Sequence, residues 1–161
     1  RYTVVTGVQT CALPIYPAWE PLKMLKGLHV STHFFIRRNG EVIQYVPTVK
    51  RAWHAGLSNF RGRNACNDFS VGIELEGTGE VPFTAVQYQA LGELLPAICR
   101  RHPVKWVTGH EFIAPGRKSD PGPFFDWGRT AQLLPAGVAL AIDETDCDRE
   151  ALARRMAEHS N

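Results

Sequence analysis

Apolar and polar residues alternate most clearly in two stretches of the first half of the chain, residues 32–46 and 70–77. The first, "THFFIRRNGEVIQYV", is interrupted by Asn39 and Gly40, which readily adopt the positive φ angles of a tight turn, so it predicts a β-hairpin. In the second, "SVGIELEG", apolar residues alternate with glycine and glutamate, as in a strand that buries one face. The glutamates fall on the other face of that strand.

Helical spacing of apolar residues replaces this alternation in the second half of the chain. Residues 84–101 begin with Thr84 and carry Gln87 three positions later, a pair typical of a capping box at a helix start. Pro96 lies inside this stretch and is expected to kink or shorten the helix. Residues 148–159, "DREALARRMAEH", predict a terminal helix.

A short strand is predicted at residues 105–108, immediately before the Gly-His pair that ends in His110. Strands interleaved with a helix are typical of the α/β class, so we expect a mixed central β-sheet flanked by helices. A length of 161 residues with 44% apolar residues suits one domain with a real core. We therefore treat residues 1–161 as one domain, in which residues 136–161 are a C-terminal extension of unknown role.

Charge and cysteine patterns exclude several kinds of protein. A net charge of +2 is too small to indicate a nucleic-acid partner, and no apolar run approaches the roughly 20 residues that cross a bilayer. The four cysteines form no CxxC pair, which argues against a disulfide framework or a cysteine zinc knuckle and favours a reducing compartment. We expect a cytoplasmic monomer that contacts neither nucleic acid nor membrane.

One loop, residues 108–123, "TGHEFIAPGRKSDPGP", combines glycine and proline with His110, Lys118 and Asp120. Histidine and carboxylate are the ligands of zinc in hydrolases, where one coordination position stays open for water. Residues ten positions apart cannot share a helix face, so the loop would have to fold back for both to reach a metal. A histidine in such a loop is more often simply solvated, and the spacing alone leaves both interpretations open.

Three separate stretches point to a family: residues 33–56, 66–77 ("CNDFSVGIELEG") and 108–127. From about Leu28 to Trp127 the chain resembles the zinc-dependent N-acetylmuramoyl-L-alanine amidases, whose fold is also that of the peptidoglycan-recognition proteins. The resemblance implies an enzyme that hydrolyses the amide between N-acetylmuramic acid, or its 1,6-anhydro form, and L-alanine of the stem peptide. The implied partner is a muropeptide from cell-wall recycling.

The resemblance also implies roles for particular residues. It places two Zn²⁺ ligands on His110 and Asp120, the catalytic glutamate on Glu74 and a catalytic lysine on Lys118. A metal that activates water and polarises a carbonyl suits amide hydrolysis, with the glutamate moving protons and the lysine stabilising the oxyanion. Without the family, Glu74 could equally be a surface carboxylate, and Glu76 on the same face is the alternative to test.

Further candidates are weaker. His54, Asn67 and His29 could bind substrate, but His54 beside a tryptophan could equally be packed, and Asn67 could simply end a loop. His33 in the first predicted strand is expected to be structural. His102 and His159, each at the end of a predicted helix, are expected to be solvated.

The N-terminus departs from the family pattern. Residues 1–16 look foreign to it, and the position of the first zinc-ligand histidine falls on Thr6, whose neutral hydroxyl is a poor zinc ligand. The sequence therefore predicts an amidase by descent that is inactive in its present form. Two alternatives remain: a module that binds peptidoglycan fragments without cleaving them, and an amidase that attacks the intact wall.

Overall fold

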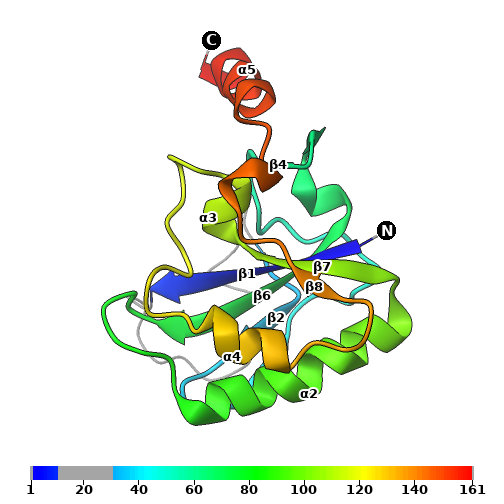
Figure 1. Cartoon of the computed structure of the whole chain (residues 1–161), viewed down its shortest axis with the longest axis vertical. Helices are drawn as coiled ribbons and strands as arrows, with labels where there is room; N and C mark the ends of the chain where they lie inside the picture. The colour runs from blue at the N-terminus through cyan, green and yellow to red at the C-terminus, as the bar shows by residue number, and fades with distance from the viewer. Residues whose placement is uncertain (1, 11–30, 161) are drawn as a thin grey trace.

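The computed structural model describes residues 2–10, for which only the backbone is considered, and residues 31–160 (Figure 1). The strands of the main sheet are β1 (Tyr2–Thr10), β2 (Phe34–Ile36), β3 (Val42–Gln44), β6 (Ser70–Gly77), β7 (Val104–Gly109) and β8 (Ala139–Leu140). Their order is β3-β2-β6-β1-β7-β8. Among the described strand pairs of this sheet, β2–β3 alone is antiparallel. The mixed sheet expected from the sequence is therefore confirmed.

The remaining described elements are helices, short turns and a small hairpin. They are α2 (Ala85–Arg101), α3 (His110–Ile113), α4 (Trp127–Gln132), α5 (Arg149–Ser160), the short 3₁₀ turns η2 (Cys66–Asp68) and η3 (Glu144–Asp146), and a small hairpin of β4 (Asn59–Phe60) and β5 (Arg63–Asn64). Figure 1 shows α2 and α4 along one face and α3 over the other. None of the helices in the described part of the chain is long and apolar enough to cross a membrane.

The main core lies between the sheet and α2. Ile73 and Leu75 of β6 are fully buried with Leu91 and Leu95 of α2 in one apolar cluster. The apolar face predicted for residues 70–77 is thus directed to α2. The opposite face of β6, which carries the glutamates, is left for the site.

Helix α2 begins as the sequence predicted but ends later. The Thr84 side chain accepts from the Gln87 N–H and the Gln87 side chain accepts from the Thr84 N–H, a complete capping box. The helix continues through Pro96 to Arg101, so the alternative that this proline shortens it is wrong, whereas a kink there stays a prediction. Ile98, beyond the proline, is buried in the main core, and we attribute the continuation to such packing, which offsets the cost of the missing N–H.

The predicted hairpin of residues 32–46 is confirmed by the antiparallel pair β2–β3, with Gly40 at φ 87° in its turn. The predicted strand at residues 105–108 is β7, and the predicted terminal helix is α5.

Strand β1 occupies the middle of the sheet, between β6 and β7. Its register sets Thr6 opposite Ile73 on β6 and opposite Gly109 on β7. Position 6 therefore lies beside the residue that precedes His110. His29 and residues 11–16 lie outside the described part of the chain, and the foreign origin of residues 1–16 stays a prediction.

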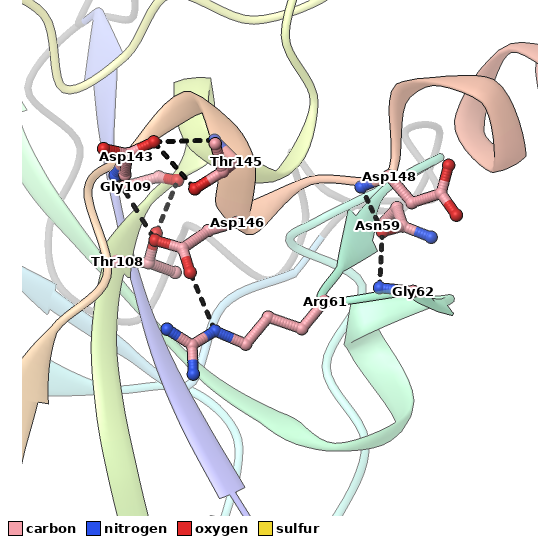
Figure 2. A network of polar contacts seen from close by, with 9 residues as sticks. All are labelled: Asn59, Arg61, Gly62, Thr108, Gly109, Asp143, Thr145, Asp146 and Asp148. Atoms are coloured by element: carbon pink, nitrogen blue, oxygen red, sulfur yellow. Dashed lines mark hydrogen bonds and ion pairs between the residues drawn. The ribbon is translucent and has the colours of Figure 1, made fainter.

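The C-terminal extension is attached to the β4–β5 hairpin by a polar network (Figure 2). Arg61 Nε donates to Asp146 Oδ1 at 2.7 Å, and its backbone N–H donates to the Asp146 carbonyl. Asn59 Oδ1 accepts from the N–H groups of Gly62 and Asp148 at 3.1 and 2.9 Å. Because Asp146 is almost fully buried, these bonds fix the start of α5 against the body of the protein.

Candidate functional site

The loop after β7 folds back on itself and brings together two of the predicted metal ligands. His110 begins α3 directly after β7, and the Glu111 N–H donates to the Asp120 carbonyl at 2.8 Å. This bond places the Asp120 carboxylate beside the imidazole, with 3.2 Å between His110 Nδ1 and Asp120 Oδ2. An imidazole nitrogen and a carboxylate oxygen, both atoms that can bind a metal, thus lie next to each other.

The other nitrogen of His110 is engaged with the protein. His110 Nε2 lies 3.0 Å from the carbonyl oxygen of Ala55, and the ring is buried. Because a carbonyl can only accept, the tautomer that forms this bond carries its proton on Nε2, whereas Arg117 Nη2, 3.3 Å from the same nitrogen, can donate only to the other tautomer. A hydrogen bond from the distal ring nitrogen to a carbonyl is the usual way in which proteins fix the tautomer and orientation of a metal-ligating histidine.

Arg117 completes this arrangement, and the sequence analysis did not select it. Its Nε donates to the Leu57 carbonyl at 3.0 Å and its Nη2 donates to the Ala55 carbonyl that also holds His110. A side chain at Gly56 would place its Cβ 3.1 Å from Nη2, so the missing side chain makes room for the guanidinium. The residue was visible in the loop, but its partners lie about 60 positions earlier in the chain, and no local pattern points to them.

The structure distinguishes the two glutamates of β6. Burial raises the pKa of Glu74 to about 8, with the Asp120 carboxylate adding to the rise and the Lys118 ammonium opposing it. Glu74 therefore lies within electrostatic reach of both loop residues. The Glu76 carboxylate instead accepts a hydrogen bond from the Arg38 N–H at 2.8 Å, so its role is structural.

Lys118 is exposed on the same loop, where its N–H donates to the Ala114 carbonyl at 3.0 Å. An exposed lysine side chain can move toward a ligand. The structure thus gathers His110, Asp120, Glu74 and Lys118 at one end of the sheet.

His54 lies in the interior of the protein. Its Nε2 is 3.2 Å from Ser70 Oγ, and its ring lies so close to Gly72 that a Cβ there would be 2.4 Å from it. Burial, together with His33 and His110, lowers the pKa of His54 to about 3, which keeps the ring neutral. The packed alternative therefore describes His54 better than a substrate contact at the rim of a groove.

Asn67 supports the loop that contacts His110. Its Oδ1 accepts the N–H groups of His54 and Ala55 at 3.0 and 2.8 Å. Asn67 also lines a cavity of about 330 Å³, so a contact with substrate stays a prediction. The third predicted binding residue, His29, is outside the described residues.

Two further histidines have structural contacts. His33 accepts the Gly72 N–H at 3.0 Å and donates to the Lys50 carbonyl at 2.8 Å, which confirms its structural role. The prediction that His102 is solvated is wrong, because its ring is buried and lies 2.7 Å from the Thr48 hydroxyl. The segment after β3 covers the end of α2, a long-range contact that the helix pattern does not reveal.

The donors fit a zinc site only in part. Among the residues whose side chains are described, no three histidine, cysteine, aspartate or glutamate side chains come together as a metal site. His110 and Asp120 have the right chemistry, but catalytic zinc is held by three protein ligands. The register of β1 pairs residue 6 with Ile73, on the side of the sheet that packs on α2, and pairs Gly7 with Glu74, so Thr6 as the third-ligand position stays a prediction.

Comparison with known proteins agrees with this geometry. The family model described as N-acetylmuramoyl-L-alanine amidase matches residues 8–123. The 1,6-anhydro-N-acetylmuramyl-L-alanine amidase AmpD of Escherichia coli K12 is 57% identical over 109 residues. That match covers 66% of this chain and 60% of AmpD, so the chain spans less than two thirds of the length of this relative.

Solved structures show the same likeness. The crystal structure of a selenomethionine AmpD derivative has a TM-score of 0.69 and 42% identity, covering 84% of this chain and 86% of that chain. AmiD from E. coli, in complex with the substrate anhydro-N-acetylmuramic acid-L-Ala-D-gamma-Glu-L-Lys, has a TM-score of 0.68 and 36% identity, covering 86% of this chain and 58% of that chain. Sequence, fold and the assembled loop residues agree that this chain belongs to the N-acetylmuramoyl-L-alanine amidase family.

Proposed function

We propose that this chain derives from an amidase that cleaves the bond between 1,6-anhydro-N-acetylmuramic acid and the L-alanine of the stem peptide during cell-wall recycling. The observation that carries the proposal is the 3.2 Å approach of His110 and Asp120, with Glu74 and Lys118 in electrostatic reach. The names of the AmpD relatives and the muropeptide bound to AmiD support the choice of substrate.

Glu74 is the residue that we propose moves the proton. A carboxyl group whose pKa is raised to about 8 by burial exchanges a proton near neutral pH. It can take a proton from an attacking water and return it to the leaving amine of L-alanine. Lys118 would stabilise the negative charge that forms on the amide oxygen, because a positive charge held near a developing oxyanion lowers the barrier.

Zn²⁺ is the cofactor that we propose for an intact enzyme of this type, with His110 and Asp120 as two of its three protein ligands. Zinc supplies an activated water and a polarised carbonyl. Among the described side chains no third ligand joins these two, and we assign no metal-dependent step to the chain as given. Little or no hydrolysis is expected from it.

A second candidate function follows from the same observation. A protein with two of three ligands can keep the groove of the family and bind wall fragments without cleaving them. The incomplete donor set favours this candidate for the present chain. The cytoplasmic location and the monomeric state stay predictions.

The decisive experiment compares the chain as given with a grafted chain, in which residues 1–16 are replaced by the N-terminal strand of a family member that carries the ligand histidine. Both are incubated with zinc and anhydro-N-acetylmuramyl-tripeptide, and release of free tripeptide is followed by chromatography. We expect turnover only from the grafted chain. Full activity of the chain as given would show that the third ligand is misassigned, and an inactive grafted chain that binds zinc tightly would refute the amidase proposal.

A further inference from the structure

A cavity of about 330 Å³ lies between the loop that supports His110 and the C-terminal helix α5. Gly56 and Asn67 line it from the loop side, and Arg155 and His159 line it from α5. Gly56 is the neighbour of Ala55, whose carbonyl holds His110, so the cavity begins one residue from the candidate site. Helix α5 lies beyond residues 8–123, the part that matches the family model.

The described residues that line this cavity are positive or neutral. Arg51, Arg155 and His159 are its basic members, and its lining includes no aspartate or glutamate. Arg51 pairs with Asp68 at 2.7 Å, and its guanidinium stacks 3.8 Å from the ring centre of Trp53. A basic wall beside a half-exposed tryptophan suits a small ligand with one anionic group and one apolar part.

The two basic residues of α5 are held one turn apart on one side of the helix. His159 Nδ1 donates to the Arg155 carbonyl at 2.8 Å, which leaves Nε2 for a ligand. Arg155 Nη1 pairs with Glu158 Oε2 at 3.1 Å, which leaves the other N–H groups of the guanidinium for a ligand. The start of α5 is fixed by the Asn59 and Arg61 network, so these side chains are presented by an anchored helix (Figure 2).

We propose that this cavity binds the carboxylate of a short peptide, with Arg155 and His159 as its contacts. The inference rests on the proposed function, because a stem peptide of the L-Ala-D-γ-Glu-L-Lys type is then the natural occupant. A γ-linked glutamate leaves its α-carboxylate outside the peptide linkage, and an arginine guanidinium donates charge-assisted hydrogen bonds to such a group. Helix α5 would thus add stem-peptide specificity from outside the matched family segment.

The test is calorimetric titration of the chain as given with free L-Ala-D-γ-Glu-L-Lys, in the presence of a chelator. We expect measurable binding that weakens about tenfold when the α-carboxylate is replaced by an amide, since a charge-assisted hydrogen bond contributes on that scale. Arg155→Ala and His159→Ala should each weaken binding by up to about tenfold. Arg154→Ala is the matched control, because Arg154 lies on the same helix, pairs with Glu150 and is not part of the cavity.

The inference is overturned if the wild-type chain does not bind the tripeptide, if the acid and amide forms bind equally, or if Arg155→Ala and His159→Ala both bind like Arg154→Ala. Thermal unfolding of each variant checks that α5 remains folded. The two proposals fail separately. Cleavage by the grafted chain without α5-dependent binding would remove only this inference, whereas α5-dependent binding without cleavage would remove only the amidase.

Discussion

His110 and Asp120 are ten residues apart in sequence, yet His110 Nδ1 lies 3.2 Å from Asp120 Oδ2 while His110 Nε2 is bonded to the Ala55 carbonyl. The ring is therefore oriented before any metal arrives. Such preorientation accounts for two ligands of a zinc site.

The first prediction concerns zinc affinity, which should be low because only two ligands are in place. The chain as given should bind zinc more weakly than the grafted chain, by more than the roughly 10- to 100-fold that loss of an outer hydrogen-bond partner of a ligand costs. Thr6→His alone should recover little of this difference, because residue 6 pairs with Ile73, on the side of the sheet that packs on α2. Equilibrium titration against a competing chelator measures the effect.

The control variants for zinc are made in the grafted chain. Asp120→Asn should lose zinc, and His159→Ala, far from the loop ligands in sequence, should keep it. Tight binding by the chain as given would mean that another side chain supplies the third ligand.

Substitution of Glu74 should affect catalysis, whereas substitution of Glu76 should affect stability. In the grafted chain, Glu74→Gln is expected to abolish turnover with zinc still bound, because an amide cannot exchange the proton. Glu76→Gln should leave turnover nearly intact but lower the free energy of unfolding by about 1 kcal/mol, since it weakens the bond from the Arg38 N–H. Steady-state hydrolysis and urea unfolding measure the two effects, and the opposite pattern would reverse the assignment.

Arg117 and Lys118 are neighbours with different expected roles. Lys118→Ala should lower kcat of the grafted chain by about 10² to 10³ and leave stability within about 0.5 kcal/mol, because the side chain is exposed. Arg117→Ala should destabilise the protein by about 1–3 kcal/mol, because the Ala55 and Leu57 carbonyls lose their donor. Thermal unfolding and hydrolysis distinguish them, and equal effects of both changes on stability would contradict the assignment.

The packed position of His54 can be tested through its neighbour. Gly72→Ala should destabilise the protein by about 1–3 kcal/mol, because the new Cβ would lie 2.4 Å from the His54 ring. The double variant Gly72→Ala with His54→Ala should recover part of this loss. Additive losses in urea unfolding of the single and double variants would show that the two side chains are not in contact.

The pH dependence of the free energy of unfolding should show the effect of the raised pKa of Glu74. In the metal-free chain its pKa is raised from 4.5 to about 8, so between these values the folded protein holds a proton that the unfolded chain has lost. The contribution of Glu74 is therefore fully present below pH 4.5 and is lost as the pH rises to about 8. Urea unfolding at several pH values should show this loss in the wild type and not in Glu74→Gln, and parallel curves would contradict it.

The sequence determined those features that depend on neighbouring residues. Asn39 and Gly40 set the hairpin turn, and Thr84 with Gln87 set the start of α2, because φ preferences and capping bonds act over a few positions. The quoted stretches also sufficed to indicate the family. Because the family motifs lie in these stretches, they located His110, Asp120, Glu74 and Lys118 as candidates.

Only the tertiary structure decided what each candidate contacts. Arg117 reaches carbonyls about 60 positions away, His54 is packed on Gly72, and Arg38 occupies Glu76 while Glu74 is left for the site. The sequence could not distinguish these outcomes, because hydrogen bonds and burial between distant segments depend on how the sheet and loops pack. The helix pattern likewise predicted α5, but only the packing of η3 and α5 on the β4–β5 hairpin brings Arg155 to the cavity beside the site.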